Sequence, residues 1–334
     1  KPGTNFNTIL YDDGAGAKTG VGFQPDLVWV KSRGSAYEHE VTDVVRGVTK
    51  ALSTDSDIIQ STDTTGLTAF GTDGFTVGAD TNYSDTTGSG MASWSWLGGG
   101  AGVANTTGTM DSTVSANTTA GFSITGYVGQ SNGETNGTIG HGLSQTPDML
   151  IVKGYSGVGG YGWRVWTPAL SSTEDIRLDT TGAVNTGRDS WNSTLPTASV
   201  FSVGNIGDVN ADGQNFIAYV FHSVEGYSKI GSYEGNDNAD GTFVYTGFRP
   251  AWIMLKKTTA VGEWVMTDDK RSPYNLVRDT IYANSNIVET EHTAVLDMVS
   301  NGFKLRYDDA SWNDTQTYLY IAFAESPFKY ANAR

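Results

Sequence analysis

Runs of four apolar residues between a proline and a lysine occur three times along this chain. They are "PDLVWVK" (25–31), "PDMLIVK" (147–153) and "PAWIMLK" (250–256), and in each the lysine stands six residues after the proline. A β-strand with one solvent-exposed face alternates apolar and polar side chains, because successive residues point to opposite faces. These runs are apolar at every position, so we predict three strands buried on both faces. One face can pack on a second sheet of the same unit, whereas the other needs an overlying loop, a neighbouring unit or another protomer.

Other patterns recur around each run in a constant order. An aromatic-hydrophobic alternation follows the prolines by 50, 54 and 53 residues, at Phe75, Phe201 and Phe303. A third block comprises "MASWSW" (91–96), "FIAYVF" (216–221) and "YIAFAE" (320–325), which we align at Trp94, Tyr219 and Phe323. A fourth precedes the runs as "TILYDDG", "ITGYVGQ" and "IGSYEGN". Four blocks in the same order indicate an internal repeat.

The blocks have the composition of short β-strands. Tyr, Trp, Phe, Val, Ile and Thr dominate them, and Gly, Asn, Asp and Ser clusters separate them. One stretch, 273–283, has the composition of a short helix. We therefore predict a mainly β chain of three tandem related antiparallel units, each like a sandwich or jelly roll, packed on one another. The expected units are 1–97, 121–228 and 229–334, with a Gly/Ala/Thr/Asn-rich connector at 98–120.

Charge and hydropathy exclude two classes of partner. The chain has 334 residues and a formal net charge of −15, so it lacks the clustered Lys and Arg that phosphate binding needs, and we expect no nucleic-acid partner. No window approaches the roughly 18 to 20 apolar residues that span a bilayer, so we expect no membrane insertion. The chain has no cysteine, which excludes disulfides and thiolate metal sites.

The chain resembles a family of uncharacterised repeat proteins encoded among the tail and other structural genes of bacteriophages, marine phages especially. The resemblance rests on "GFQPDLVWVKSR" with "DVVRG", on "GHGLSQTPDMLIVK", on "DGTFVYTGFRPAWIMLK" and on "YIAFAESPFKYANAR". It implies a component of the virion surface, such as a tail fibre, a receptor-binding protein or a capsid-attached fibre, with other virion proteins as partners. Such fibres are commonly homotrimers, although three internal units could also form a pseudo-threefold body from one chain. The resemblance supplies no catalytic residue.

Aromatic side chains are the candidates for a binding role. Sugars stack their apolar C–H faces on such rings while Asp, Asn and Gln bind the hydroxyls. The candidates for host-surface glycan binding are Trp191, Trp312, Trp166 and Trp264. Of these, Trp191 and Trp312 lie in polar loop sequence, where we expect exposure, although a loop tryptophan can also plug the end of its own sandwich.

One acidic turn has the spacing of a calcium loop. In "DVNADG", Asp208, Asn210 and Asp212 precede Gly213 as in D-x-N-x-D-G. Position twelve is Tyr219, where a bidentate glutamate belongs. Both a hairpin turn and a weak calcium site remain open, and we expect no other cofactor.

An Asp and an Arg three residues apart recur in two of the three units. Asp43 and Arg46 correspond to Asp268 and Arg271, whereas the second unit has Thr167 and Leu170 at these positions. The pair is either a structural ion pair at a strand end or a polar clamp for a hydroxylated ligand.

No enzyme motif stands out in the chain. The four histidines have no short zinc spacing, and there is no G-x-S-x-G elbow or dinucleotide fingerprint. We therefore predict a non-enzymatic virion adhesin that recognises host polysaccharide. The alternatives are a decoration fibre without a ligand and a polysaccharide depolymerase, which would need two suitably spaced carboxylates.

Overall fold

The computed structural model describes residues 5–12, 14–85, 87–131, 136–157 and 160–324. About 45% of the chain is β-strand and 1% is helix, which confirms the predicted mainly β class. The strands of the described residues pair in antiparallel fashion. In the described part of the chain the only helix is the single turn α1 (Gly207–Asn210), and no helix is long and apolar enough to span a membrane. The predicted helix at 273–283 is wrong, because this stretch contains strand β24, whose residues pair with β23 and β25.

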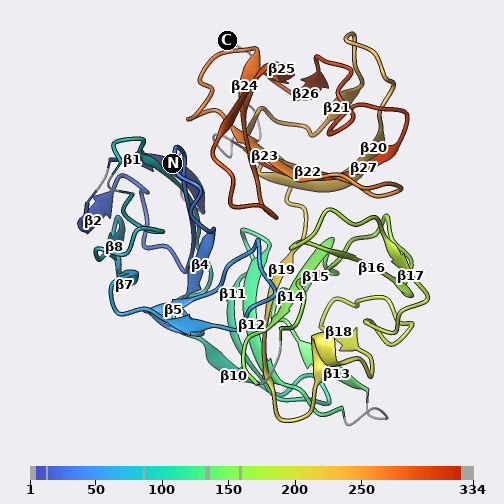
Figure 1. Ribbon diagram of the computed structural model, residues 1–334. Coiled ribbons are helices and arrows are strands. Elements are labelled where there is room, and N and C mark those ends of the chain that lie inside the picture. Colours follow the sequence, from blue (N-terminus) through green and yellow to red (C-terminus); the bar gives the residue numbers. More distant parts are fainter. Residues whose placement is uncertain (1–4, 13, 86, 132–135, 158–159, 325–334) are drawn as a thin grey trace.

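The strands form three lobes around a common centre, which Figure 1 shows as a blue, a green-to-yellow and an orange-to-red group. The first lobe (residues 5–97) contains β1 (Phe6–Tyr11), β2 (Gly16–Thr19), β3 (Leu27–Ser32), β4 (Glu40–Asp43), β5 (Lys50–Ala51), β6 (Ser61–Thr62), β7 (Leu67–Gly71), β8 (Gly74–Val77) and β9 (Met91–Trp96). The second lobe (98–226) contains β10 (Val103–Asn105), β11 (Ser112–Asn117), β12 (Phe122–Val128), β13 (Gly137–Gly140), β14 (Met149–Gly154), β15 (Arg164–Trp166), β16 (Glu174–Arg177), β17 (Asn185–Thr186), β18 (Val200–Val203), α1 and β19 (Asn215–Phe221). The third lobe (227–324) contains β20 (Ser228–Glu234), β21 (Phe243–Tyr245), β22 (Pro250–Lys257), β23 (Trp264–Asp268), β24 (Val277–Tyr282), β25 (Thr290–Val299), β26 (Gly302–Leu305) and β27 (Thr317–Ala324).

Each lobe has four strands in the same spatial order. These quartets are β1-β9-β3-β4, β12-β19-β14-β15 and β20-β27-β22-β23, in which the proline-initiated run is the third strand. A further antiparallel pair, β2-β8, β13-β18 or β21-β26, contributes the buried Phe75, Phe201 or Phe303. The first two pairs lie in sheets of their own, whereas β21-β26 belongs to the same sheet as its quartet. In the second and third lobes further strands extend the quartet to eight, and the third sheet curls toward a barrel.

The strand register corrects one alignment made from the sequence. Trp94 pairs with Trp29, Tyr219 pairs with Ile151, and the matching partner of Met254 is Ile321. The prediction that aligned Phe323 with Trp94 is therefore wrong by two residues. A shift of two keeps a side chain on the same face of a strand, so the apolar pattern could not reveal the error.

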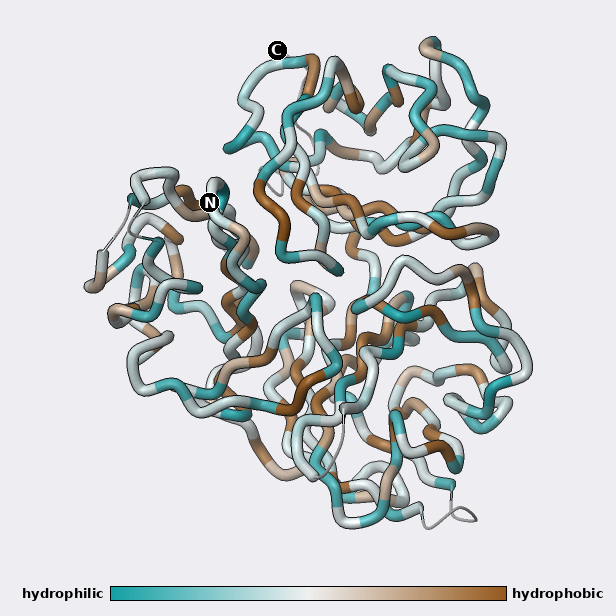
Figure 2. The backbone as a smooth tube through the Cα atoms, in the orientation of Figure 1, coloured by the Kyte–Doolittle hydropathy of each residue, from teal (hydrophilic) through white to brown (hydrophobic). Residues whose placement is uncertain are grey.

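The three proline-initiated strands are buried on both faces, as predicted. In β3, Val28 and Val30 pack into the core of the first lobe, whereas Leu27 and Trp29 belong to the large core that the three lobes share. The same division holds in the third lobe. Figure 2 shows the hydrophobic segments of the strands concentrated where the lobes meet.

Three equivalent aromatic rings meet at the centre of the molecule. Trp96, Phe221 and Phe323 occupy the same position in the three quartets, and each contacts the other two at centroid distances of 5.8–6.5 Å, all edge-to-face. Edge-to-face geometry suits the quadrupoles of the rings. This cluster belongs to the core that the three lobes share.

A loop from each lobe joins the next lobe by a backbone hydrogen bond at an equivalent position. The bonds are Gln60 N–H to Tyr155 O (3.2 Å), Val184 N–H to Thr258 O (2.9 Å) and Glu289 N–H to Arg33 O (2.7 Å). The last bond joins the third lobe back to the first, so the ring of lobes is closed.

The predicted connector is part of the second sheet. Its strands β10 and β11 add to the edge of β12, with Val114 and Met110 buried. Its first residues, 98–102, run over the end of the first quartet, where the amide of Gly100 donates to Asp26 (3.0 Å).

Candidate functional site

The interfaces between neighbouring lobes, here called seams, contain one repeated polar contact. Trp163 and Trp264 donate their indole N–H groups to the carbonyl oxygens of Ser53 and Arg177 in the preceding lobe, at 2.9 and 2.8 Å. The first lobe has His39 at this position, with Nε2 3.0 Å from Tyr282 O of the third lobe. Trp264, predicted as a glycan contact, is therefore part of a seam and is 1% exposed.

The tautomer of His39 follows from its second contact. Its Nδ1 accepts the indole N–H of Trp29 at 2.9 Å, so the proton of the neutral ring lies on Nε2 and is donated to Tyr282 O. Burial lowers the pKa of His39 well below its ordinary value, so the ring is neutral.

The Asp–Arg pairs also lie in seams, fully buried. Arg46 donates Nε–H to Asp43 Oδ2 (2.6 Å), and the hydroxyl of Tyr219 from the second lobe donates to the same oxygen (2.8 Å). In the third lobe Asp268 accepts from Arg271 (2.6 Å) and from the indole N–H of Trp94 (3.1 Å).

The second lobe lacks this ion pair for a reason that the seams show. The residue equivalent to Tyr219 and Trp94 in the third lobe is Ile321, which has no donor, and the positions of the ion pair are Thr167 and Leu170 in the second lobe. Leu170 and Ile321 belong to the same buried core. The pair is therefore present where the neighbouring lobe supplies a hydrogen-bond donor and absent where it does not.

The expected exposure of Trp191 and Trp312 is wrong. Trp191 is 1% exposed and donates its indole N–H to Glu174 O (2.9 Å), and Trp312 is 0% exposed with its ring against His292 (4.9 Å between centroids). Each ring packs inside its own lobe, which agrees with the alternative that a loop tryptophan fills the end of its own unit. Neither ring face is available for stacking on a sugar.

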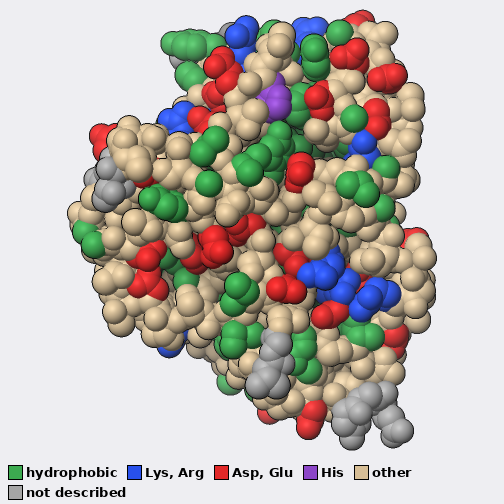
Figure 3. All heavy atoms as spheres, in the orientation of Figure 1, with side chains coloured by type: hydrophobic (Ala, Val, Ile, Leu, Met, Phe, Trp, Pro, Cys, Tyr) green, Lys and Arg blue, Asp and Glu red, His purple; other side chains and the backbone are tan. Residues whose placement is uncertain are grey.

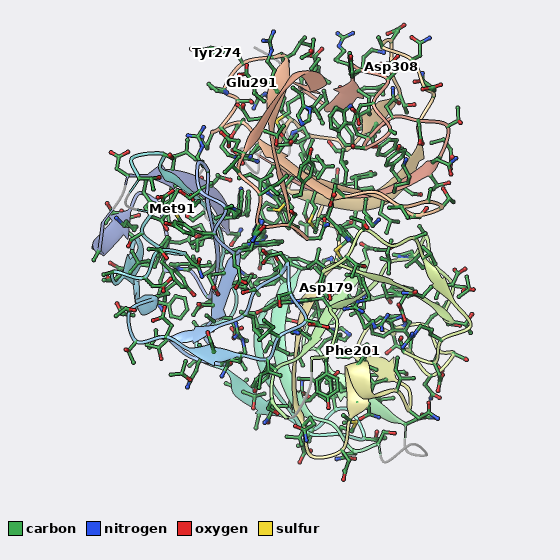
Figure 4. The ribbon with its side chains drawn as sticks, viewed as in Figure 1. Met91, Asp179, Phe201, Tyr274, Glu291 and Asp308 are labelled. Atoms are coloured by element: carbon green, nitrogen blue, oxygen red, sulfur yellow. The ribbon has the colours of Figure 1, made fainter. Side chains whose placement is uncertain are left out.

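The residues of the calcium-like spacing have other partners. Asp208 lies between two arginines, forming a short ion pair with Arg164 and a 3.2 Å contact with Arg188. The side chain of Asn210 is buried and donates to Gly204 O, while Asp212 is exposed. In the described ranges no group of three or more His, Asp or Glu side chains could hold a metal ion. Figure 3 shows a group of Lys or Arg side chains on the surface of the second lobe, near the position at which Figure 4 labels Asp179, the ion-pair partner of Arg177.

Of the tryptophan candidates, Trp166 lines a hollow. The hollow has a volume of about 480 Å³ and lies at the end of the second quartet. Its wall comprises Trp166, three prolines, two leucines, Asp148 and hydroxyl residues, namely Pro147, Pro168, Pro196, Leu170, Leu195, Thr146, Ser171 and Ser172. Trp166 itself is 3% exposed, and its indole N–H donates to Ser171 O (3.2 Å).

The exposed aromatic side chains lie elsewhere, in the third lobe. Among the described residues the exposed aromatics are Phe243, Tyr245, Tyr274 and Tyr307, with exposed fractions of 46, 66, 82 and 40%. Figure 4 shows Tyr274 at the outer end of this lobe, near Glu291. The sequence signal was the alternation "FVY" beside a Gly turn, which a search limited to tryptophan misses.

Phe243 and Tyr245 form a flat face on the outside of the β21-β26 pair. Both point outward, since the intervening Val244 is buried. Lys304 lies directly opposite Phe243, and Asp297 lies opposite Lys304 on β25. Gly302 has no side chain beside Tyr245, and a Cβ there would come within 3.1 Å of the Phe243 ring, so this ring lies across the strand. We call these four residues, Phe243, Tyr245, Lys304 and Asp297, the aromatic face.

Several charged groups are buried outside these sites. Burial raises the pKa of Glu40 to about 8, and the hydrogen bond that Oε1 accepts from Asn82 (2.9 Å) opposes this rise only in part. Among the described residues, Oε2 has no hydrogen-bond partner. Burial lowers the pKa of the repeated lysines, Lys31, Lys153 and Lys256, to about 8 in each case. Lys153 and Lys256 each donate to a carbonyl of the preceding lobe, Asp57 O (2.8 Å) and Thr181 O (3.1 Å). These two lysines therefore contribute to seams, whereas Lys31 donates to Ser32 O (2.8 Å) and Ser35 O (3.0 Å) of its own lobe.

Comparison with known proteins places the chain in one family. A family model described as a domain of unknown function (DUF7483) matches residues 1–327. The chain belongs to this DUF7483 family. No curated protein and no solved structure matches the chain.

Proposed function

We propose that this DUF7483 protein is an adhesive component of a phage particle surface that binds host polysaccharide through the aromatic face. We further propose that its chain consists of three copies of one β unit, which close into a pseudo-threefold ring. The virion assignment is supported by the sequence resemblance. The three-unit proposal is supported by the equal strand order of the quartets and by the equivalent bonds across the seams.

The proposal of glycan binding rests on the aromatic face. Two rings spaced i and i+2 on one strand offer an apolar platform for the C–H faces of consecutive sugars. Lys304 and Asp297 stand beside them to bind hydroxyl or carboxylate groups; Lys304 also pairs with Asp240 (2.8 Å), and Asp297 with Arg306 (2.5 Å). A flat platform suits a polymer chain more than a single small sugar.

A ring of three lobes from one chain offers an alternative to the expected homotrimer. The three lobes supply from one polypeptide the threefold arrangement that a fibre otherwise obtains from three chains. The proposal therefore uses a single chain, and the oligomeric state stays a prediction that sedimentation equilibrium can measure.

The test compares retention on polysaccharide by matched variants. Wild type, a Phe243→Ala/Tyr245→Ala double variant and a Tyr274→Ala control are incubated with insoluble capsular polysaccharide and lipopolysaccharide of marine bacteria, and the bound fraction is measured. We expect retention of wild type and of the control and its loss in the double variant, because Tyr274 is more exposed but lies outside the aromatic face.

Each other outcome favours an alternative. Retention that the double variant keeps would move the site elsewhere. No retention of wild type on any polymer would favour a decoration fibre without a ligand, and the release of new reducing ends would favour a depolymerase.

A further inference from the structure

The hollow beside Trp166 has an occupied counterpart in the first lobe. Asp148 of the hollow and Asp26 stand at the same position, each directly after the proline that begins its run. At Asp26 the connector residues 98–102 lie over the end of the quartet. The amide of Gly100 donates to Asp26 Oδ2 (3.0 Å), and a Cβ on Gly102 would approach a methyl of Val45 to 3.4 Å. A bent segment of this chain, in which Gly100 has a φ of +76°, therefore covers that end of the first lobe.

In the second lobe the chain takes another path and leaves the equivalent place open. After β19 it turns within residues 222–228 toward the third lobe, closed by the bond from Val224 N–H to Ser228 O (3.1 Å). Ser223 donates to Asp148 Oδ2 (2.6 Å), and Oδ1 has no hydrogen-bond partner among the described residues. The hollow of about 480 Å³ remains over Asp148.

We propose that this hollow binds a short, bent peptide segment of a partner protein, with glycine or another small residue over Asp148. The occupant donates a backbone N–H to Asp148, as Gly100 does to Asp26 in the first lobe. An apolar side chain of the same segment then packs between Trp166, Leu195 and the prolines.

The chemistry of the hollow favours a peptide over an anionic ligand. Asp148 is the only charged side chain in the wall, so an anion gains nothing there, and an amide N–H is a strong donor to a carboxylate. Volumes of 300 to 1,000 Å³ suit ligands of roughly drug size, which is about three or four residues of peptide.

The probe is a peptide copied from the occupied lobe. Acetyl-LGGGAGV-amide, residues 97–103 of this chain, is titrated into the full-length protein and followed by the Trp166 indole N–H resonance in two-dimensional NMR, assigned by a Trp166→Phe variant. We expect saturable shifts with a millimolar dissociation constant. The same peptide with N-methylglycine at the Gly100 position lacks the N–H, and we expect it to bind about tenfold more weakly.

Two protein variants provide the control. Ser172→Trp fills the hollow from its rim and should abolish the shifts, while Ser193→Trp, at an exposed position outside the wall, should leave them unchanged. Unchanged thermal melting of both variants shows that the fold is kept. Equal binding of the two peptides, binding that survives Ser172→Trp, or no binding of the first peptide up to 20 mM (on the order of ten times the expected constant) would overturn the proposal.

Discussion

The hydrogen bond from Tyr219 to Asp43 joins the first two lobes, and replacing Tyr219 by Phe should weaken the whole fold. Asp43 and Arg46 have fully buried side chains, so the carboxylate depends on protein donors alone. Its Oδ1 accepts from the amides of Val45 (3.0 Å) and Arg46 (2.9 Å), and its Oδ2 accepts from Arg46 and from Tyr219. Burial raises the pKa of Tyr219 well above its ordinary value, so the hydroxyl stays protonated and donates.

The substitution removes one of four hydrogen bonds to a buried charge. A hydrogen bond to a charged group contributes about 1.5–3 kcal/mol, and Phe keeps the ring that stacks on Trp163 (6.3 Å between centroids). We therefore expect the free energy of unfolding to fall by about 2 kcal/mol. Urea denaturation, followed by far-ultraviolet circular dichroism and tryptophan fluorescence, measures this change.

The control is Tyr274→Phe, in which an 82% exposed ring loses the same atom. It should change the free energy of unfolding by less than about 0.5 kcal/mol. Equal effects of the two substitutions would mean that the seam hydrogen bond contributes no stability beyond that of a surface hydroxyl, and the account of the seams given above would fail.

Three further predictions concern buried charge and ring closure. Glu40→Gln should stabilise the fold relative to wild type increasingly as pH rises from 5, by about 3 kcal/mol at pH 7. The reason is that burial raises the pKa of Glu40 from 4.5 to about 8, so the native wild type binds more protons than its unfolded state in this pH range and loses stability as pH rises. Glu38→Gln is the control, and an equal gain at pH 4 would refute this origin. The stability of wild type relative to Lys256→Met should rise by about 2 kcal/mol between pH 8 and pH 10. The reason is that burial lowers the pKa of Lys256 from 10.5 to about 8, so the unfolded state binds more protons than the native state in this pH range. A stability difference that does not change with pH would contradict this prediction. A circular permutant that starts at Thr107, with the original ends joined, should melt cooperatively near the wild-type temperature, because Phe6 and Phe323 stack at 4.9 Å; loss of cooperative melting would count against this.

The apolar pattern predicted the three proline-initiated strands well, because a strand buried on both faces is apolar at every position. The runs after the prolines are apolar at every position. In the first and third lobes one face of the run packs in a lobe core and the other in the shared core, whereas both faces of the second run pack in the shared core. The number of faces to be covered could thus be counted from sequence alone. Which neighbour covers the second face could not, since that depends on contacts such as Tyr219 to Asp43, 176 residues apart.

The tryptophan predictions failed for a physical reason. Trp191 and Trp312 are flanked by Ser, Asn and Asp, which are typical of exposed turns. A polar turn can nevertheless place one large ring inward, and the buried area of that ring then outweighs the polar context of its neighbours. Exposure is instead found at Phe243 and Tyr245 on a short edge strand, where one side of the strand has no layer above it.

The differences between the seams specify the order of the lobes around the ring. Tyr219 packed on the Thr167 and Leu170 positions would bury a hydroxyl with no charged acceptor, at a cost of about 1–3 kcal/mol. Ile321 packed on Asp43 and Arg46 would leave the buried carboxylate short of one donor, at a similar cost. A pairing of lobes other than the observed one is thus destabilised at these side chains. The three backbone hydrogen bonds are equivalent in all seams, so they would form whichever lobes were neighbours. The repeated features therefore close the ring, and the features in which the copies differ select which lobe meets which.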